Sequence, residues 1–169
     1  AASASTRVEQ ARHALAKGAL TTAGALLQKQ MQEQPNDAYA LALLGHLSLL
    51  NGRPVQAEAL LRRALGLAPT DLRVHVELYR FLHKQRRDEE SVAALRQALE
   101  LAPGWLPLQK DLAEAHAKLN QHEQAIEVLD RVLAQDENSV DSWLRLAESL
   151  VTVGDTERAI RSFRRAQTI

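Results

Sequence analysis

The side chains of this sequence that could do chemistry do not assemble into a catalytic or metal-binding pattern. The chain contains six histidines and no cysteine, and no two histidines stand four residues apart, as two ligands on one helix face would. His122 and Glu123 begin like a zinc-protease motif, but Gln124, Ala125 and Ile126 break it. There is no G-x-S-x-G turn and no glycine-rich phosphate loop. We therefore predict no catalytic residue, no metal and no cofactor, and no enzymatic activity in this chain.

Charge and hydropathy exclude two further classes of partner. The basic cluster at residues 84–87, Lys-Gln-Arg-Arg, could contact phosphate, but the acidic residues 88–90 follow at once and largely cancel it. Lys plus Arg equals Asp plus Glu, 21 each, so no overall charge favours nucleic acid. No run approaches the roughly 18 apolar residues of a membrane span. We predict neither nucleic-acid binding nor direct membrane insertion, and the absence of cysteine leaves the compartment undecided.

The elements that position these side chains recur with a fixed period. Pro35, Pro69 and Pro103 are 34 residues apart, and Glu137 takes the next place. A small residue and, four residues later, a large one recur in the same phase, at Ala23, Ala57, Ser91, Ala125 and Ala159 and at Leu27, Leu61, Leu95, Leu129 and Phe163. Each copy has the apolar spacing of two helices. The sequence predicts an all-α chain of antiparallel helix pairs, in copies 4–37, 38–71, 72–105, 106–139 and 140–169.

This pattern resembles the tetratricopeptide repeat (TPR) family, whose 34-residue pattern is W-x2-L-G-x2-Y, then A-x3-F, then P. The matching residues are Leu41, Leu44, Gly45, Ala57, Leu61 and Pro69 in the second copy and Trp143, Leu146, Ala147, Ala159 and Phe163 in the fifth. The third copy departs from the pattern at Tyr79, and the first at Gln10 and Gln30. The resemblance implies an α-solenoid of about ten helices. It also implies a right-handed superhelix whose first helices line a concave groove, over a single array spanning residues 1–169.

Turn and packing positions fit two closely packed helices per copy. Gly18, Gly52, Asn120 and Gly154 lie where a helix end needs positive φ. In the third copy Arg86 takes that place, so its turn is the least well predicted. Small residues on the first helix, such as Gly45, should allow close approach to the small residues of the second, because a larger side chain there would overpack the contact.

The resemblance implies that partners bind groove-facing residues of the first helices. The predicted partner-binding residues are Arg12, Tyr39, His46, Leu49, Arg73, Val76, Arg80, His83, Lys110 and Glu114. Helix 38–50 is apolar nearly all round, which indicates either a partner surface or packing of Leu43 and Leu50 against neighbouring repeats. The third copy holds six basic and five acidic residues and the fourth three and seven, so a bound peptide would meet basic and then acidic surface. The alternative is a solvated face of i, i+4 pairs.

Many chaperone-binding TPR domains grip a carboxylate with Lys, Asn and Arg, but the corresponding places here hold Val8, Arg12, Leu43, Arg73 and Glu77, so that mode is rejected. The functional hypothesis is a module that binds a protein or peptide segment. Two alternatives stay open: a docking arm of a larger enzyme, such as a sulfotransferase, glycosyltransferase or oxygenase, and a self-association scaffold. The missing initiator Met, and repeat ends without a capping helix, lead us to expect a fragment of a longer protein or homo-oligomer contacts through those ends. The Ala, Arg, Leu and Gln bias favours a bacterial source.

Overall fold

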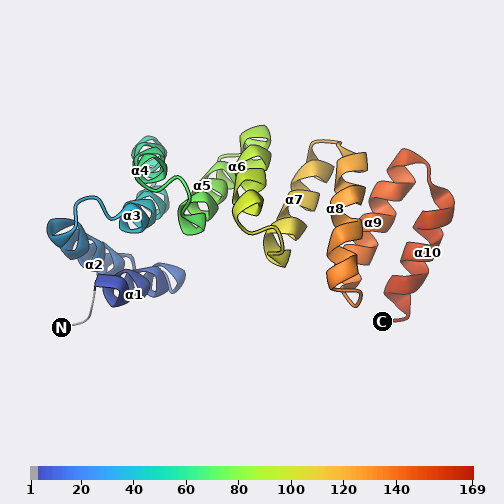
Figure 1. Cartoon of the computed structure of the whole chain (residues 1–169), viewed down its shortest axis with the longest axis horizontal. Helices are drawn as coiled ribbons and strands as arrows, with labels where there is room; N and C mark the ends of the chain where they lie inside the picture. Colours follow the sequence, from blue (N-terminus) through green and yellow to red (C-terminus); the bar gives the residue numbers. More distant parts are fainter. Residues whose placement is uncertain (1–3) are drawn as a thin grey trace. The chain divides into compact units, whose positions relative to one another are not determined.

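The computed structural model describes residues 4–169, and all regular secondary structure in that range is helical (Figure 1). The first helices of the five pairs are α1 (Ala4–Ala16), α3 (Ala38–Leu50), α5 (Leu72–Lys84), α7 (Leu106–Lys118) and α9 (Val140–Val153). The second helices are α2 (Leu20–Glu33), α4 (Pro54–Leu67), α6 (Asp88–Leu101), α8 (His122–Gln135) and α10 (Thr156–Gln167). First and second helices each begin 34 residues after their counterparts in the preceding pair. The all-α fold of helix pairs and its register are therefore confirmed. No helix within residues 4–169 is long and apolar enough to span a membrane.

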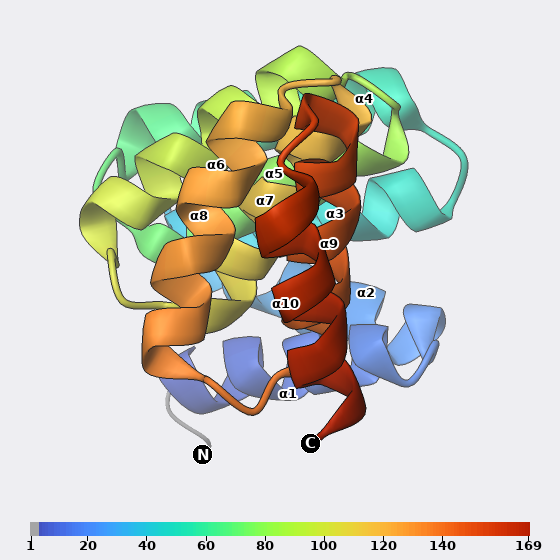
Figure 2. The same cartoon turned by 90° about the vertical axis from the view of Figure 1, so that its right-hand side faces the viewer.

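The helices form two compact units, which divide between Arg86 and Arg87. In unit 1, α1 packs on α2 and α3 packs on α4, and α3 also contacts α1 and α5. The first helices of unit 1 therefore form a continuous layer. In unit 2, α7 packs on α8 and α9 on α10, with further contacts from α6 to α7 and from α8 to α9 (Figure 2).

Helix starts follow local capping chemistry. Asp37, Asp71 and Ser139, at equivalent places of three copies, accept hydrogen bonds from backbone N–H groups of the helices that follow. Pro54 begins α4, where its missing N–H leaves no intrahelical bond unmade. The acidic residues 88–90 form the first turn of α6, where negative charge favours the helix dipole.

In every copy, the residue at one fixed position of the turn between the two helices has a left-handed backbone conformation. The predicted positive φ is found at Gly18 (73°), Gly52 (72°), Asn120 (56°) and Gly154 (86°). Arg86, where the turn was least well predicted, has φ of 55° and adopts the same conformation. Because a Cβ makes this region unfavourable, the repeat geometry imposes a local backbone strain on Arg86.

Small residues hold the paired helices close, as the sequence predicts. A Cβ added to Gly45 of α3 would lie 2.9 Å from Leu61 Cγ and 3.1 Å from the Ala57 carbonyl oxygen of α4. Ala113 and Ala147, at the equivalent places of α7 and α9, are buried. The large residues of the second helices, Leu27, Leu61, Leu95 and Leu129, are buried as well.

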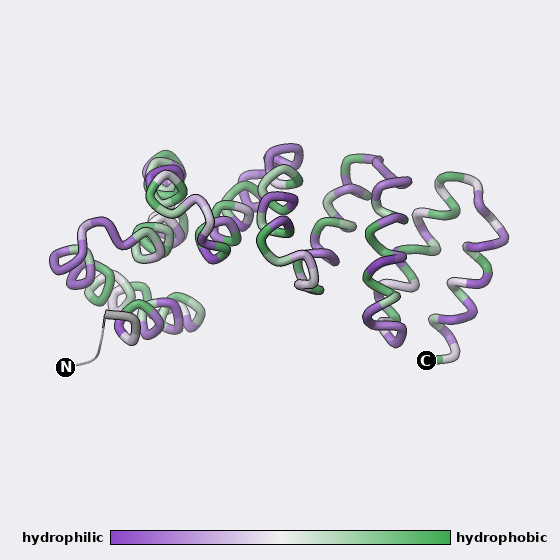
Figure 3. Tube along the Cα trace, viewed as in Figure 1, coloured by the Kyte–Doolittle hydropathy of each residue, from purple (hydrophilic) through white to green (hydrophobic). Residues whose placement is uncertain are grey.

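Two apolar regions differ in burial. In α3, Leu41, Leu43 and Leu47 are buried, so this face belongs mainly to the core, while Leu50 is exposed. Of the two alternatives for helix 38–50, the burial of Leu43 fits packing against neighbouring helices, whereas Leu50 does not pack in this way. In α10, where apolar and polar residues alternate along the trace in Figure 3, Phe163 is 38% exposed, unlike the buried leucines at its equivalent positions.

A hydrogen bond from the first helix to the preceding loop recurs with changing chemistry. His75 Nε2 bonds the Pro69 carbonyl oxygen at 2.7 Å, Gln109 Nε2 donates to that of Pro103, and Trp143 Nε1 donates to that of Glu137 at 2.8 Å. These three donors are 34 residues apart. In the second copy the equivalent residue is Leu41, and the carbonyl of Pro35 instead accepts from Arg63 of α4 at 3.4 Å.

The departures of the first copy from the repeat pattern have a local explanation. Gln30 is fully buried where the other copies have an apolar residue. Its Oε1 accepts from Arg7 at 3.1 Å, and its Nε2 donates to Asp37 at 2.7 Å. Because both ends of the amide are satisfied, the buried polar group is tolerated. Gln10 is exposed on α1.

Candidate functional site

The first-helix layer of unit 1 is organised around a buried carboxylate. The side chain of Glu77 on α5 is 4% exposed, and its Oε2 lies 3.1 Å from His46 Nδ1 of α3. Its Oε1 accepts from Arg80 at 3.0 Å, one turn further along α5. A buried charge is costly unless it is paired and hydrogen-bonded, and both oxygens of this carboxylate have partners. His46 and Arg80, predicted separately from the sequence, therefore meet at one centre.

Tyr39 and Arg73 form a second contact between α3 and α5. The Arg73 guanidinium carbon lies 4.3 Å from the centre of the Tyr39 ring, a cation–π geometry. Arg73 is also held by Asp71, through Nε at 3.0 Å and a terminal nitrogen at 2.6 Å. The hydrogen bond from Arg73 lowers the pKa of Asp71. Arg73 is thus fixed in position while its outer surface stays exposed.

Electrostatics links these two contacts to α1. Burial raises the pKa of Tyr39 to about 12, and the negative charges of Glu77 and Glu9 add to the effect. The hydrogen bond that Arg12 Nε donates to Glu9, at 2.8 Å, raises the pKa of Arg12, with smaller contributions from the charges of Glu9, Tyr39 and Glu77. Because α1 contacts α3 and the charges of Tyr39 and Glu77 act on Arg12, we group Arg12 with the residues of α3 and α5. We call this surface, formed by Arg12, Tyr39, His46, Arg73, Glu77 and Arg80, the unit 1 face.

A cavity of about 250 Å³ adjoins the unit 1 face. Its apolar lining comes from Leu49, Leu61, Tyr79 and Phe81. Its charged and polar lining comes from His46, Glu77, Arg80, His83 and Lys84. The rings of Tyr79 and His83 are 5.8 Å apart. Leu49 and His83, both predicted to bind a partner, are thus brought to one cavity, which we call the α3–α5 cavity. Val76, also predicted, is buried and does not line it.

Lys110 and Glu114, the two predicted partner-binding residues of unit 2, form ion pairs with different neighbours. Lys110 Nζ lies 3.2 Å from Asp136 and 3.1 Å from Ser139 Oγ, at the loop before α9. Glu114 pairs with Lys118 at 2.6 Å and with Arg145 of α9 at 3.2 Å. Both side chains therefore tie helices of unit 2 together through ion pairs.

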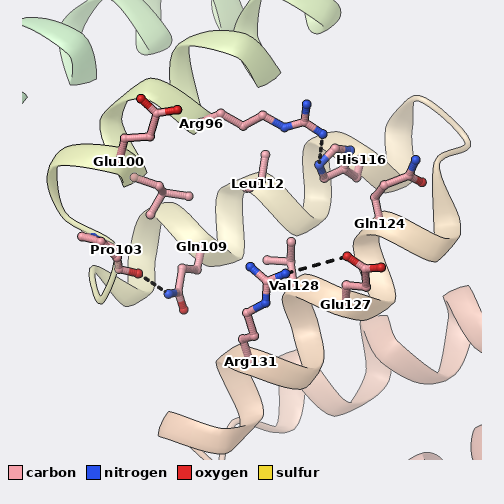
Figure 4. A pocket seen from close by; sticks show the side chains of 11 residues that line it. Arg96, Glu100, Pro103, Gln109, Leu112, His116, Gln124, Glu127, Val128 and Arg131 are labelled. Carbon is pink, nitrogen blue, oxygen red and sulfur yellow. Dashed lines mark hydrogen bonds and ion pairs between the residues drawn. The ribbon is translucent and has the colours of Figure 1, made fainter.

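A larger cavity in unit 2, of about 370 Å³, is bounded by α6, α7 and α8 (Figure 4). In Figure 4, Arg96 reaches across it to His116, whose Nε2 is 3.5 Å away. His116 is buried and also bonds Gln121 through Nδ1 at 2.7 Å. Arg96 and Arg131 among the lining residues are balanced by Glu100 and Glu127, so this cavity has no net preference for one sign of charge. None of the predicted partner-binding residues lines it.

Sequence reasoning missed the centre of the unit 1 face. Glu77 was considered only as a mismatch to the carboxylate-binding pattern, although it is an acidic residue surrounded by Val76, Leu78 and Tyr79. An isolated charge in an apolar stretch, three residues before Arg80, is the signal that could have indicated a buried pair. Tyr79 was noted only as a departure from the small residue expected there, and it lines the cavity. Within residues 4–169, no group of three or more His, Cys, Asp or Glu side chains is placed to hold a metal ion.

The geometry defines a helical-repeat protein whose side chains converge on the first-helix layer. Sequence profiles of the tetratricopeptide repeat match residues 14–79, 48–115, 82–148 and 140–169. The chain therefore belongs to the tetratricopeptide repeat family, a family of protein–protein interaction repeats.

Solved structures of other TPR proteins have the same fold. A crystal structure of MamA gives a TM-score of 0.79 at 18% identity, covering 94% of this chain and 92% of that one. The Pseudomonas aeruginosa protein pilF gives 0.81 at 22%, covering 98% and 75%. YrrB, described as a TPR protein with an unusual peptide-binding site, gives 0.77 at 17%, covering 95% and 83%. A search of curated proteins finds no match. At these identities the likeness concerns the fold alone.

Proposed function

We propose that this chain is a non-catalytic interaction module whose unit 1 face binds a peptide or protein segment. The observation that carries the proposal is the convergence of side chains from α1, α3 and α5 around Glu77. His46 and Arg80 satisfy the Glu77 carboxylate, while Arg12 is held by Glu9 and Arg73 by Asp71 and the Tyr39 ring. Each arginine of the face is paired with a carboxylate of the protein, so the face offers guanidinium groups that are already held in position and that keep unused N–H donors for a ligand. Pre-organised side chains of this kind lose little conformational entropy on binding.

Two further observations support a protein partner. The exposed guanidinium groups of Arg73 and Arg80 have donors in excess of those used by Asp71 and Glu77, and guanidinium groups bind carboxylates in a bidentate manner. YrrB, a protein of the same fold, has a peptide-binding site. The proposed ligand is thus a peptide segment with acidic character, bound across the first helices of unit 1.

The test compares charge reversals on and off this face. Peptides are selected on the full chain from a random library, and their affinities are measured by fluorescence anisotropy. Arg73→Glu and Arg80→Glu should each weaken binding by about tenfold or more, because an attractive charge becomes a repulsive one. Arg161→Glu, an exposed reversal on α10 of unit 2, is the matched control and should leave affinity unchanged.

Circular dichroism checks that each variant keeps its helix content. Equal affinity of all three variants for the selected peptides would show that binding does not use this face. Arg73→Gln separates the two effects of the reversal, since it removes the charge without introducing repulsion.

A second candidate, self-association, is supported by exposed apolar residues in unit 2. Val151 of α9 is 57% exposed, and Ile160 and Phe163 of α10 and Ile169 just beyond it are exposed as well. Contiguous exposed apolar surface favours association, and α9 and α10, which carry most of these residues, pack against each other. Sedimentation velocity over a wide range of concentrations tests this function. A monomer whose sedimentation coefficient does not change with concentration rules it out.

A further inference from the structure

The α3–α5 cavity combines an apolar interior with a basic rim. Its apolar walls are Leu49 of α3, Leu61 of α4, and Tyr79 and Phe81 of α5. Tyr79 stands at the position where the other copies have Gly45, Ala113 or Ala147, so this wall is specific to the third copy. A volume of about 250 Å³ accommodates a large apolar side chain. The apolar walls and the volume of the cavity therefore fit an apolar side chain of a ligand.

The rim of the same cavity is cationic. Arg80, His83 and Lys84 line it and are exposed. Glu77 is the single carboxylate in the lining, and it is buried, with its two oxygens engaged by His46 and Arg80. Lys84 has no carboxylate partner among the residues that the structure describes. Its place in the last turn of α5 suits the helix dipole, but that interaction leaves its ammonium group open to a ligand.

We propose that the α3–α5 cavity binds an apolar anchor residue of a partner segment that carries acidic residues beside the anchor. The inference rests on the proposed function and specifies the chemistry of the ligand. The anchor, a leucine or a residue of similar size, contacts Leu49, Tyr79 and Phe81. The neighbouring carboxylates pair with Lys84 and Arg80 at the rim. A segment with basic residues at the same places is repelled, because its charges meet the cationic side chains of Arg80 and Lys84.

The probes are three peptides that differ at single features. The first has the sequence Gly-Ser-Glu-Leu-Glu-Ser-Gly, the second replaces its Leu by Ala, and the third replaces both Glu by Lys. Each carries a fluorescent label and is titrated with the full chain by anisotropy. The Leu peptide with Glu should bind about tenfold tighter than its Ala version, because burial of a leucine side chain contributes that order of affinity. The Lys version should not bind, and added salt should weaken only the acidic peptides.

Matched variants locate the binding. Leu49→Asp places a carboxylate in the cavity wall and should reduce affinity more than tenfold, as the cavity then repels the acidic peptide. Val55→Asp introduces the same carboxylate at an exposed apolar residue of α4 that does not line the cavity, and it should have no effect. Lys84→Glu reverses the charge at the rim of the cavity. Lys118→Glu makes the same reversal at the equivalent position of α7, which does not line the cavity, and is its control. Because Lys84 and Lys118 are exposed, these two variants test the rim without affecting the core.

The outcomes separate this inference from the proposed function. Binding that is weakened by Arg73→Glu but unchanged by Leu49→Asp and Lys84→Glu overturns the cavity and leaves the unit 1 face as the binding surface. The absence of saturable binding by the Leu peptide also overturns the inference, while library-selected peptides continue to test the function. Equal affinity for the Glu and Lys peptides overturns the role of the basic rim. Loss of binding confined to Leu49→Asp and Lys84→Glu, with their controls unchanged, supports the inference.

Discussion

The contact between Gly45 and α4 gives a sharp test of how the helix pairs are packed. Replacing Gly45 by Ala adds one methyl group to the middle of α3. That carbon would lie 2.9 Å from Leu61 Cγ and 3.1 Å from the Ala57 carbonyl oxygen. Neither atom is the free end of a flexible side chain, and Leu61 is buried. The helices must therefore move apart, or the Leu61 side chain must leave its rotamer.

Two opposing effects determine the size of the change. Alanine favours a helix interior over glycine by about 1 kcal/mol. Overpacking of a close contact costs about 1–3 kcal/mol. We expect the second effect to win, so that Gly45→Ala lowers the free energy of unfolding by about 1 kcal/mol. In a chain of this length a change of 1 kcal/mol lowers the melting temperature by about 2–4 °C.

Gly24→Ala is the matched control, because the same substitution in α2 of the same unit meets only Leu47 Cδ2, at 3.5 Å. This distance is ordinary van der Waals contact, so Gly24→Ala should raise the free energy of unfolding by up to about 1 kcal/mol. Urea unfolding followed by far-UV circular dichroism measures both variants. If Gly45→Ala stabilises the protein as much as Gly24→Ala does, the argument that small residues set the approach of α3 and α4 is refuted.

Three other predictions concern backbone strain, the buried phenol and the buried carboxylate. Arg86→Gly should raise the free energy of unfolding by up to about 1 kcal/mol, because glycine adopts the left-handed conformation without strain. Gln85→Gly, at a neighbouring residue with φ of −80°, should lower the free energy of unfolding. Equal effects of the two substitutions in urea unfolding would contradict this reasoning. Because the pKa of Tyr39 is raised from 10.0 to about 12, the folded state holds its proton more tightly than the unfolded state. Its contribution to stability is then fully present below pH 10 and is lost as the pH rises towards 12, and Tyr39→Phe should remove that part of the loss in alkaline unfolding experiments. Glu77→Ala should lower the free energy of unfolding by about 1–3 kcal/mol, because His46 and Arg80 lose a hydrogen-bonded partner, and Glu77→Gln should cost less because it keeps an acceptor; the same urea assay compares the two, and identical losses would show that the acceptor does not matter.

The fold was predictable because the repeat pattern consists of residues whose effect on structure is local. A proline at a fixed spacing indicates a helix end, and a small residue indicates a close contact between two helices. Both features depend only on neighbours within one helix pair. The 34-residue register of both helix sets follows from them directly. Arg86 shows the limit of reading one residue at a time. An arginine does not favour positive φ, yet Arg86 has the same left-handed conformation as Gly18 and Gly52 at the same repeat position.

The candidate site was predictable only in part, because it depends on side-chain contacts between different helices. Arg73 and Tyr39 were both predicted, but their stacking depends on the facing of α5 and α3, which no spacing within one copy reveals. Glu77 was missed because burial of a charge depends on partners from two helices. Lys110 and Glu114 were selected by repeat position alone, and that criterion could not anticipate that their charges are used by Asp136 and Arg145.

The hydrogen bond from the first helix to the preceding loop has a consequence for exchanging repeats between proteins. His75, Gln109 and Trp143 have little in common as side chains, yet each places an N–H group at a carbonyl six residues earlier. A transplanted repeat must therefore supply a side chain whose N–H group reaches this carbonyl, and the type of side chain can vary. The second copy shows that the donor can even come from another helix, since Arg63 serves Pro35. Chimaeras assembled from these copies should tolerate any order in which every such loop carbonyl finds a donor, and those that leave one without a donor should be the least stable.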